Sequence, residues 1–488
     1  MPDELPPSAA VPAARRIYCN RTLNLRAIAA IGYDMDYTLV HYRVDHWERR
    51  AYDHIRRMLL AEGWPVDELR FDPGLVTRGL VIDTELGNVV KANRFGFVMR
   101  ACHGTRPMTF EEQREAYRHL PIDLAEARFY FLNTLFSLSG SCLFAQLVDL
   151  YDQRRFPEVL GYHDLFQRIH RHLDTTHLEG TLKAEILADP KPYIDLDPDA
   201  PLALLDQRRS GKRLLIITNA EWSYVRAVMA YAFDRFLPEG MTWRDLFELV
   251  IVGARKPDFF SASLPLFSIV DEERGLLAPA AQGFRGPGCY VGGDAGSVEQ
   301  HLGLSGAEIL YVGDHIFADV RMSKSLLRWR TGLILRELED EVASLEAFRP
   351  RESELAALMA DKERLEAEHA GVRLALQRAQ LGYGPRPATA PDVLAARLAE
   401  LKERILDLDQ RVAPLAREAS QAVDARWGPL LRAGNDKSHL ARQIEASADV
   451  YTSRVSNFLL ATPFAYLRAS RGSMPHDPNL PNPAPSAD

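Results

Sequence analysis

The stretch AIAAIGYDMDYTLVHY, from Ala27 to Tyr42, decides the fold of this chain. Ala27–Tyr33 is short and mostly apolar, which predicts a strand that is covered on both faces in a parallel sheet. Ligands of such sheets bind beyond the carboxyl ends of the strands. Asp34 and Asp36 follow the run directly, with Thr38 two residues later, so we expect an active site at this strand end.

Two carboxylates at a strand end can perform different tasks, because the chain is leaving extended geometry and the side chains need not point the same way. One can attack phosphorus and form an aspartyl-phosphate, while the other transfers protons. The alternative is a polar turn, since aspartate is common where a strand becomes a loop. The pair alone leaves both interpretations open.

Three later apolar runs also end in residues that suit phosphate chemistry. The runs are RLLIITNA at 213–220, VIVGARKPDFF at 250–260 and AEILYVGDHIFAD at 307–319. In order they supply Thr218, Asn219, Lys256, Asp314 and Asp319. Taken singly, the lysine could be an exposed loop residue, and an aspartate after an apolar strand is common in α/β proteins. The order and spacing favour a common site.

At this point the chain resembles the haloacid dehalogenase-like phosphohydrolases, which carry a DxDx[TV] motif, a Thr or Ser, a Lys and a GDxxxD or GDxxxxD motif in this order. The resemblance implies an α/β fold: a three-layer Rossmann-like core with an inserted mixed α/β cap and, in this chain, a helical C-terminal appendage. It also implies Mg²⁺ as the cofactor.

A narrower resemblance follows from the exact residues of the motifs and of other segments. Six segments are similar to the cytosolic purine 5'-nucleotidases that prefer IMP and GMP: DMDYTL at 34–39, TRGLVIDTELGN at 77–88, LNTLF at 132–136, ARKPDFF at 254–260, YVGDHIFAD at 311–319 and MPHD at 474–477. Relatives of that group with unassigned substrates share several of these segments. The segments are spread over most of the chain.

The superfamily resemblance assigns a role to each motif residue. Asp34 would be the nucleophile and Asp36 the acid that protonates the leaving oxygen and later activates water. Thr218 and the Asn219 amide would bind the phosphoryl oxygens, and Lys256 would supply a fixed positive charge. The metal would be bound by Asp34, the Asp36 carbonyl and Asp314, with Asp319 orienting the ligands and Lys256 from behind.

The composition sets the class of partner. The chain has 488 residues, of which 47% are hydrophobic, and a formal net charge of −8, so nothing favours nucleic acid or an anionic membrane. Four distant cysteines form no CxxC pair, which argues against zinc and disulfides. The N-terminus lacks the apolar core of a signal peptide, and we expect a cytoplasmic protein that binds a small nucleoside monophosphate.

The spacing of the motifs predicts the domains. More than 180 residues separate Asp34 from Thr218, far more than a crossover helix needs, so a cap should be inserted between them. The predicted parts are a core at 17–50 and 190–350, a cap at 51–189, a helical hairpin at 351–422 and a C-terminal segment at 423–474 that packs on the core. Residues 1–16 and 475–488 are predicted to be disordered tails.

Within the cap, HRHLDTTHLEGTLK at His170–Lys183 is dense in titratable groups beside Gly180, which indicates a binding loop; a solvated helix end is the alternative. The purine nucleotidases use an aspartate and a lysine of a similar stretch to hold the base and the phosphate. This resemblance makes five residues substrate-binding candidates: Asp174, His177, Lys183, Phe136 and Asn133. A family arginine is His170 here.

Leucine and alanine recur at helical spacing from about Arg351, interrupted at 382–391. This predicts helices over Ser353–Leu381 and Pro391–Ala422 that lie antiparallel with an apolar seam. Such a hairpin is typical of packing or self-association, and we expect a homo-oligomer, a dimer or a tetramer. Three functions compete: a purine 5'-nucleotidase, with phosphotransfer to a second acceptor left open, a phosphatase of another small ester, and a catalytically silent assembly protein.

Overall fold

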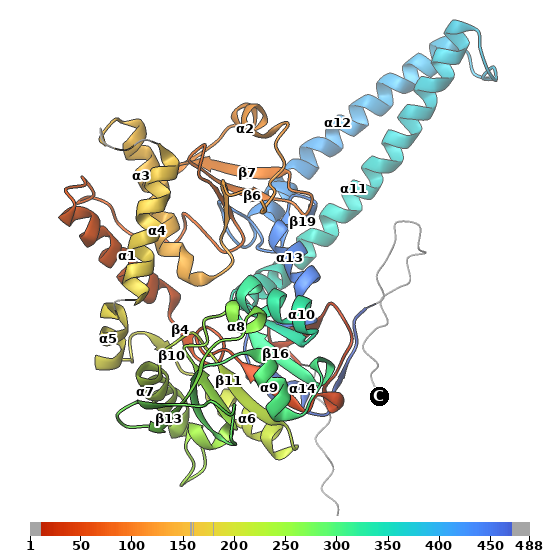
Figure 1. Ribbon diagram of the computed structural model, residues 1–488. Helices are drawn as coiled ribbons and strands as arrows, with labels where there is room; N and C mark the ends of the chain where they lie inside the picture. Colours follow the sequence, from red (N-terminus) through yellow and green to blue (C-terminus); the bar gives the residue numbers. More distant parts are fainter. Residues whose placement is uncertain (1–10, 157–158, 160, 179, 471–488) are drawn as a thin grey trace, which may run out of the picture. The chain divides into compact units, whose positions relative to one another are not determined.

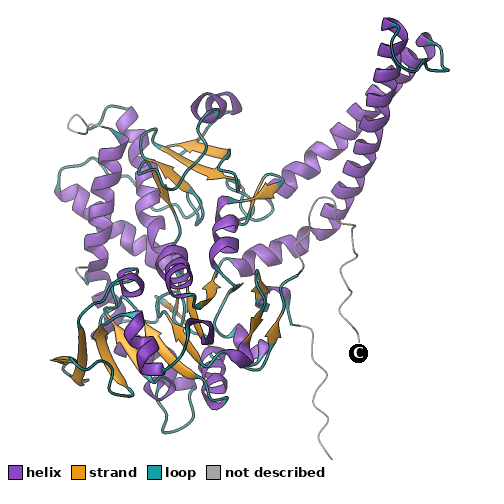
Figure 2. Ribbon diagram, turned by 45° about the vertical axis from the view of Figure 1, so that its right-hand side comes forward, coloured by secondary structure: helices purple, strands orange, loops and turns teal. Residues whose placement is uncertain are grey.

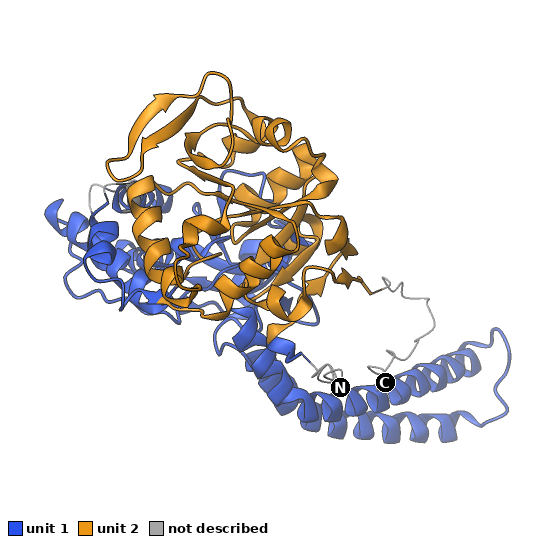
Figure 3. Ribbon diagram, turned by 90° about the horizontal axis from the view of Figure 1, so that it is seen from below, with its two compact units in different colours: residues 1–14, 42–194, 336–443 blue, residues 15–41, 195–335, 444–488 orange. Residues whose placement is uncertain are grey.

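The computed structural model describes residues 11–156, 159, 161–178 and 180–470. The chain divides into two compact units, coloured separately in Figure 3. Unit 1 comprises residues 1–14, 42–194 and 336–443, and unit 2 comprises residues 15–41, 195–335 and 444–488. The chain passes between the units five times: between Ala14 and Arg15, within β4 (His41–Tyr42), within β10 (Ile194–Asp195), between Leu335 and Arg336, and within α13 (His439–Ser447).

Unit 2 is built on a ten-stranded sheet of order β1-β20-β17-β16-β3-β11-β12-β15-β13-β14. All neighbours from β20 to β15 are parallel, and β1, β13 and β14 join antiparallel. The prediction of an α/β protein with a large, mostly parallel sheet is therefore confirmed. The strands are β1 (Tyr18–Cys19), β3 (Ala30–Tyr33), β11 (Arg213–Ile217), β12 (Leu249–Val252), β13 (Leu266–Asp271), β14 (Leu276–Pro279), β15 (Gly288–Gly292), β16 (Ile309–Gly313), β17 (Arg330–Ile334) and β20 (Val450–Thr452).

The central strands are buried on both faces because their sequences are apolar at successive positions. Every residue of β3, β12 and β16 is buried, which requires helices on both sides of the sheet, as Figure 2 shows. On one face, side chains of α8 and α9 join those of the strands in a single apolar cluster. The helices of unit 2 are α6 (Asp199–Arg209), α7 (Trp222–Phe233), α8 (Asp258–Ser261), α9 (Ala295–Leu302), α10 (Met322–Leu327) and α14 (Asn457–Ala461).

Unit 1 contains a five-stranded antiparallel sheet of order β8-β7-β6-β5-β9 and a group of helices in which α1 packs on α3 and α4 (Figure 1). The strands are β5 (Val81–Asp83), β6 (Asn88–Ala92), β7 (Val98–His103), β8 (Arg106–Pro107) and β9 (Phe129–Phe131). The helices are α1 (Val44–Ala61), α2 (Phe110–Tyr117), α3 (Leu138–Asp152), α4 (Tyr162–Leu178) and α5 (Thr181–Ala188).

A long helical hairpin also belongs to unit 1. Its helices are α11 (Leu338–Leu381) and α12 (Pro391–Gln421), so α11 begins earlier than the predicted Ser353. Their apolar seam consists of Leu358, Leu365, Leu401, Leu408, Val412 and Leu415. The predicted antiparallel pairing is what the structure contains (Figure 1).

Phe129–Phe131 forms the edge strand β9, which pairs antiparallel with β5. His170–Lys183 was expected to be either a binding loop or a helix end, and it lies mostly in α4 and α5, as the second alternative has it. The helix continues because Leu165, Ile169 and Leu173 keep burying one face at helical spacing.

Unit 1 contains residues 42–50, which were predicted to belong to the core, and residues 336–443 together with the predicted cap. The boundaries of the domains stay a prediction. Most of the two predicted tails falls outside the described residues, although Ala13–Arg15 form a turn of 3₁₀-helix. Among the described helices, none has the length and apolar character that a bilayer-spanning helix needs.

Candidate functional site

Two aspartates emerge side by side at the carboxyl edge of the unit 2 sheet. Asp34 follows β3 and Asp314 follows β16, and these strands are parallel neighbours. The backbone N–H of Asp34 donates to the carbonyl of Val312 at 2.9 Å, which extends the ladder up to the site. Both side chains are buried. The parallel arrangement thus brings the first and last motifs together, as their sequence positions predicted.

Lys256 lies between two carboxylates. Its Nζ is 2.8 Å from Oδ1 of Asp34 and 2.7 Å from Oδ1 of Asp319. It also donates to the hydroxyl of Tyr311 at 3.1 Å, and that hydroxyl donates to the carbonyl of Ile217 at 2.9 Å. Lys256 is therefore a buried, fixed cation and not an exposed loop lysine.

Burial and charge oppose each other in this cluster. Burial raises the pKa of the Asp34 carboxyl to about 6, against the attraction of Lys256, which lowers it. Burial alone would lower the pKa of Lys256, but the carboxylates of Asp319 and Asp34 outweigh it, and the pKa lies well above its usual value. The ammonium thus stays charged and holds the two carboxylates in place.

Asn219 of the second motif, Thr218-Asn219, holds the backbone of Lys256 through hydrogen bonds. The side-chain amide of Asn219 donates to the carbonyl of Lys256 at 3.1 Å, and its Oδ1 accepts from the backbone N–H of Lys256 at 2.6 Å. Thr218 is buried, and its Oγ1 accepts from the N–H of Ala220 at 3.2 Å. The predicted phosphate-binding Asn219 therefore also fixes the position of Lys256, which the sequence did not reveal.

Asp319 comes from a π-helical turn at Ile316–Arg321 that follows β16. One oxygen faces Lys256, and the other accepts from the backbone N–H of His315 at 3.1 Å. The turn brings Asp319 so close to Gly313 that a Cβ at position 313 would lie 2.5 Å from Oδ2 of Asp319. Gly313 is thus required by the close approach of a functional side chain.

The buried carboxylates have the chemistry of a divalent cation site. Asp34, Asp314 and Asp319 each offer an oxygen, and these oxygens lie within 4.8 Å of one another. Three buried carboxylates carry more negative charge than Lys256 can balance, and hard oxygen donors suit Mg²⁺. Since both oxygens of Asp319 already accept from protein donors, Asp34 and Asp314 fit the role of direct ligands. Asp36, two residues after Asp34, is half-buried.

The five predicted substrate residues all belong to unit 1, whereas the seven motif residues belong to unit 2. Asn133 and Phe136 precede α3, and the Phe136 ring packs edge-on against Trp47 with centroids 5.5 Å apart. His177 lies in α4. Lys183 lies in the first turn of α5.

Asp174 is exposed on α4 beside an aromatic group. Its Oδ2 is 3.7 Å from Nδ1 of His170, and the His170 ring packs against Tyr130 and Phe166 with centroids 4.9 and 5.2 Å apart. Burial, with a smaller contribution from Asp174, raises the pKa of the Tyr130 hydroxyl. His170 thus contacts Asp174 from the preceding helical turn.

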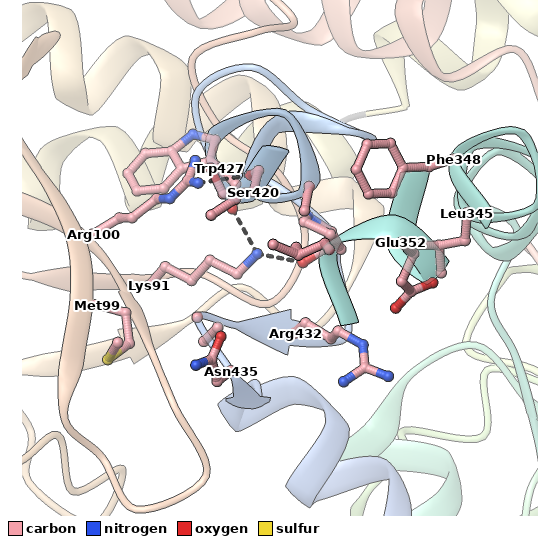
Figure 4. Close-up of a pocket in the computed structure, with 16 residues that line it drawn as sticks. Lys91, Met99, Arg100, Leu345, Phe348, Glu352, Ser420, Trp427, Arg432 and Asn435 are labelled. Atoms are coloured by element: carbon pink, nitrogen blue, oxygen red, sulfur yellow. Dashed lines mark hydrogen bonds between the residues drawn. The ribbon is translucent and has the colours of Figure 1, made fainter. Parts of the chain in front are cut away.

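Sequence reasoning missed a charged cavity in unit 1. The cavity, of about 350 Å³, lies between β6–β7 and the base of the α11–α12 hairpin, and Figure 4 shows Lys91 reaching into its wall. The Lys91 ammonium donates to the carbonyls of Trp427 and Pro429 at 2.7 and 2.5 Å. Burial lowers its pKa to about 8. In the sequence, this cavity could have been indicated by Lys91, a charged residue within the strand β6, whose five residues are all buried.

Arg100, like Lys91, donates hydrogen bonds to backbone carbonyls, those of Arg426 and Ser420, at 2.6 and 2.7 Å. The Glu341 carboxylate of α11 accepts from the backbone N–H groups of Leu430 and Leu431. The charged side chains of Lys91, Arg100 and Glu341 therefore hold the end of the hairpin and the segment that follows it through hydrogen bonds to the backbone.

Several known proteins are similar to this chain over most of its length. Residues 17–479 match the 5' nucleotidase family. The chain is 26% identical over 479 residues to a 5'-nucleotidase domain-containing protein of Dictyostelium discoideum, which covers 94% of this chain and 74% of that protein. Human 5'-nucleotidase domain-containing protein 1 is 29% identical over 360 residues, covering 68% of this chain and 76% of the relative.

Human 5'-nucleotidase domain-containing protein 2 is 28% identical over 490 residues, covering 94% of this chain and 84% of the relative. The family match spans both units and includes every motif residue of the site. The chain therefore belongs to the 5'-nucleotidase family and is by that family a phosphoric monoester hydrolase.

Proposed function

We propose that this protein is a Mg²⁺-dependent 5'-nucleotidase that hydrolyses purine nucleoside monophosphates, IMP and GMP, through an aspartyl-phosphate on Asp34. The observation that carries the proposal is the buried group of Asp34, Asp314 and Asp319 around the cation of Lys256. We assign unit 2 as a haloacid dehalogenase-like core and the inserted part of unit 1 as its cap.

In the first step, a carboxylate oxygen of Asp34 attacks phosphorus, forming an O–P bond while the bond from phosphorus to the ribose oxygen breaks. Asp36 gives its proton to that ribose oxygen. In the second step, Asp36 takes a proton from water, whose oxygen attacks phosphorus and releases Asp34 and phosphate. When bound by Asp34, Asp314 and the Asp36 carbonyl, Mg²⁺ neutralises charge on the phosphoryl oxygens.

Lys256 serves both steps as a fixed charge. Its ammonium orients the Asp34 carboxylate from 2.8 Å and faces the negative charge of the phosphoryl group. Asn219 keeps the lysine backbone in place through two hydrogen bonds. Thr218 and the backbone amide of Asn219 would bind phosphoryl oxygens beside it.

The choice of base is assigned to unit 1. A carboxylate at Asp174 accepts a hydrogen bond from N1–H of a 6-oxopurine but meets a lone pair at N1 of adenine. That mismatch costs on the order of 1–3 kcal/mol, which corresponds to a 5- to 150-fold preference. Phe136 is proposed to stack on the base and Lys183 to bind the phosphate, and Asn133 and His177 stay substrate-binding candidates.

A single panel tests the proposal. Phosphate release is measured from IMP, GMP, AMP, UMP, a sugar phosphate and an aryl phosphate, with Mg²⁺ and again after chelation. We expect IMP and GMP to be turned over fastest and all activity to need Mg²⁺. Equal efficiency on all esters would reject the purine assignment but keep the phosphatase chemistry. No release from any ester would indicate an assembly protein, and full activity without metal would reject the role of Mg²⁺.

The base-recognition residue has its own test. Asp174→Ala should reduce the ratio of catalytic efficiency on IMP to that on AMP about tenfold or more, because the donor at N1 loses its acceptor. The rate on a small aryl phosphate should stay within about twofold, since that substrate has no base. An unchanged IMP-to-AMP ratio would remove Asp174 from base recognition.

A further inference from the structure

Tyr311 carries the only polar side-chain group of the strand β16. All five residues of β16 are buried, and Tyr311 has no exposed surface. Its neighbours in the strand have apolar side chains or none. A buried hydroxyl must find hydrogen-bond partners within the protein, because water does not reach it. The partners of this hydroxyl therefore indicate what a tyrosine does here that a phenylalanine could not.

The ring of Tyr311 crosses β3 to reach β11. The strand β3 lies between β16 and β11 in the sheet of unit 2, and its residue Gly32 is paired with Tyr311. A Cβ at position 32 would lie 2.9 Å from Cδ2 of the ring, so the ring occupies the space that a side chain there would need. The hydroxyl donates to the carbonyl of Ile217, the last residue of β11, at 2.9 Å. Gly32 thus leaves room for the ring to reach the carboxyl end of β11.

Aromatic side chains hold the ring in this direction. Phe260 packs edge-on against it with centroids 5.3 Å apart, and the Trp329 ring lies at 6.1 Å. All three residues belong to the same buried apolar cluster of unit 2. Protein interiors are close-packed, so the ring cannot turn or slide freely. The hydroxyl of Tyr311 is therefore held at a fixed point.

The hydroxyl accepts a hydrogen bond from Lys256, because its own hydrogen is used elsewhere. A phenol has one hydrogen to donate. Its possible acceptors are the carbonyl of Ile217 at 2.9 Å and Oδ1 of Asp319 at 3.4 Å, and only the shorter contact has the usual length of an O–H···O hydrogen bond. An ammonium can only donate, so Nζ of Lys256 donates to the Tyr311 oxygen at 3.1 Å.

Two acceptors thus direct the ammonium of Lys256. Nζ donates to Asp319 at 2.7 Å and to Tyr311 at 3.1 Å, and Oδ1 of Asp34 lies 2.8 Å from it. The lysine stem is flexible, so one contact alone does not fix where the charge lies. The hydroxyl is neutral and therefore adds a second fixed contact without competing with Asp34 for the positive charge.

We propose that Tyr311 is a positioning residue: its hydroxyl, anchored on the carbonyl of Ile217, holds the ammonium of Lys256 beside Asp34 during phosphoryl transfer. The inference rests on the proposed function, in which Lys256 faces the charge of the phosphoryl group. Such a charge stabilises the transition state most when it is already in place before the reaction. Tyr311 therefore contributes to the chemical step rather than to substrate binding.

The test uses two Tyr→Phe variants of the full-length protein. Tyr311→Phe removes only the hydroxyl, and Tyr290→Phe is the matched control. The Tyr290 hydroxyl also donates to a carbonyl, that of Gly286 at 3.0 Å, and accepts from the backbone N–H of Arg285 at 3.3 Å. Its ring lies in the same apolar cluster, but neither of these two partners is a motif residue. The control thus removes the same kind of buried hydroxyl away from Lys256.

A second variant, Gly32→Ala, approaches the same contact from β3. The added methyl group must displace the Tyr311 ring, which moves the hydroxyl without removing it. For all variants, kcat and KM are measured with IMP and with a small aryl phosphate in the presence of Mg²⁺. Circular dichroism and denaturant unfolding check that each variant is folded under the assay conditions.

We expect Tyr311→Phe and Gly32→Ala to lower kcat about tenfold or more on both esters with KM within about twofold, because the charge is misplaced while the substrate contacts remain. Tyr290→Phe should keep the kcat and KM of the wild type, even if it is destabilised as much as Tyr311→Phe. A wild-type kcat in Tyr311→Phe or Gly32→Ala, or an equal fall in Tyr290→Phe, would overturn the role of Tyr311, while turnover by the wild type leaves the nucleotidase function standing. A wild type that releases no phosphate from either ester would reject the proposed function and this role with it.

Discussion

Lys256 makes three kinds of contact, and its sequence motif alone does not reveal them. It forms ion pairs with Asp34 and Asp319 at 2.8 and 2.7 Å, donates to Tyr311, and is held through its backbone by Asn219. Breaking a buried pair on one side leaves an uncompensated charge, which costs several kcal/mol. These buried charges therefore also form part of the core of unit 2.

Gly313 shows the same coupling between packing and chemistry. Gly313→Ala would place a Cβ 2.5 Å from Oδ2 of Asp319, so the carboxylate must move away from Lys256 and His315. We expect a loss of about 1–3 kcal/mol of unfolding free energy and at least a tenfold fall in kcat, measured by denaturant unfolding and phosphate release.

Gly371 provides the control for this prediction. It lies within α11 with no atom within 4 Å of an added Cβ, so Gly371→Ala should stabilise the protein by up to about 1 kcal/mol. If the two variants unfold alike and turn over alike, the close approach at Gly313 has no functional consequence.

At the scale of elements, α1 carries a buried acid that should make unit 1 sensitive to pH. Glu48 is fully buried and accepts a hydrogen bond from the backbone N–H of Ser139 at 2.7 Å, yet burial raises its pKa from 4.5 to about 8. The folded protein then keeps a proton that the unfolded chain has lost. The contribution of Glu48 to stability therefore falls as pH rises from 4.5 to about 8.

Glu48→Gln replaces the titrating carboxyl group with an amide. It should therefore reduce the pH dependence of the free energy of unfolding. The wild type should lose up to about 1.4 kcal/mol of unfolding free energy per pH unit through this group, and the variant should be the more stable protein at pH 8. Denaturant unfolding at several pH values measures both slopes, with Glu111→Gln on the exposed side of α2 as the control. Parallel curves for all three proteins would contradict the assignment.

Elements set by local pattern could be predicted from the sequence. Each of the four apolar runs contains or overlaps one of the central strands β3, β11, β12 and β16, because a strand buried on both faces needs a continuous apolar run. The order of the motifs also indicated which side chains meet at the sheet edge. The interpretation of His170–Lys183 as a loop rested on its polar composition, although buried positions at helical spacing continue α4 into this stretch.

Contacts between distant residues could not be predicted in this way. Arg50 and Glu185 are 135 positions apart and meet only because α5 packs beside α1. The hydroxyl of Tyr311 lies in an otherwise apolar strand, and nothing in the sequence shows that it contacts Lys256. Single polar groups within apolar segments, such as Tyr311 and Lys91, were the available signal.

At the scale of the whole molecule, the helical hairpin is the part that the site does not use. Its seam is apolar, and ion pairs such as Lys362–Asp409 at 2.5 Å and Arg397–Glu368 at 2.6 Å join the helices across it. Beyond the seam, Leu381, Tyr383 and Val393 are exposed near the far end. Such a surface suits contact with a second copy of the chain.

Deleting residues 351–422 should therefore change assembly more than chemistry. Arg351 pairs with Glu418 across the hairpin, and a Gly/Ser linker joins residues 350 and 423 in the deletion variant. We expect fewer subunits per particle by light scattering, with kcat within about threefold of the intact protein. An unchanged subunit number would reject self-association through the hairpin.

The central claim is that Asp34 carries the phosphoryl group during turnover. The most direct measurement mixes the protein with radiolabelled IMP and Mg²⁺, quenches in acid within milliseconds and locates the label by peptide mapping. The account predicts a hydroxylamine-sensitive label on the peptide that contains Asp34, its absence in Asp34→Asn, and a loss of turnover in that variant on the order of 10³-fold or more. Steady turnover by the wild type without any covalent label, or by Asp34→Asn at a similar rate, would contradict it.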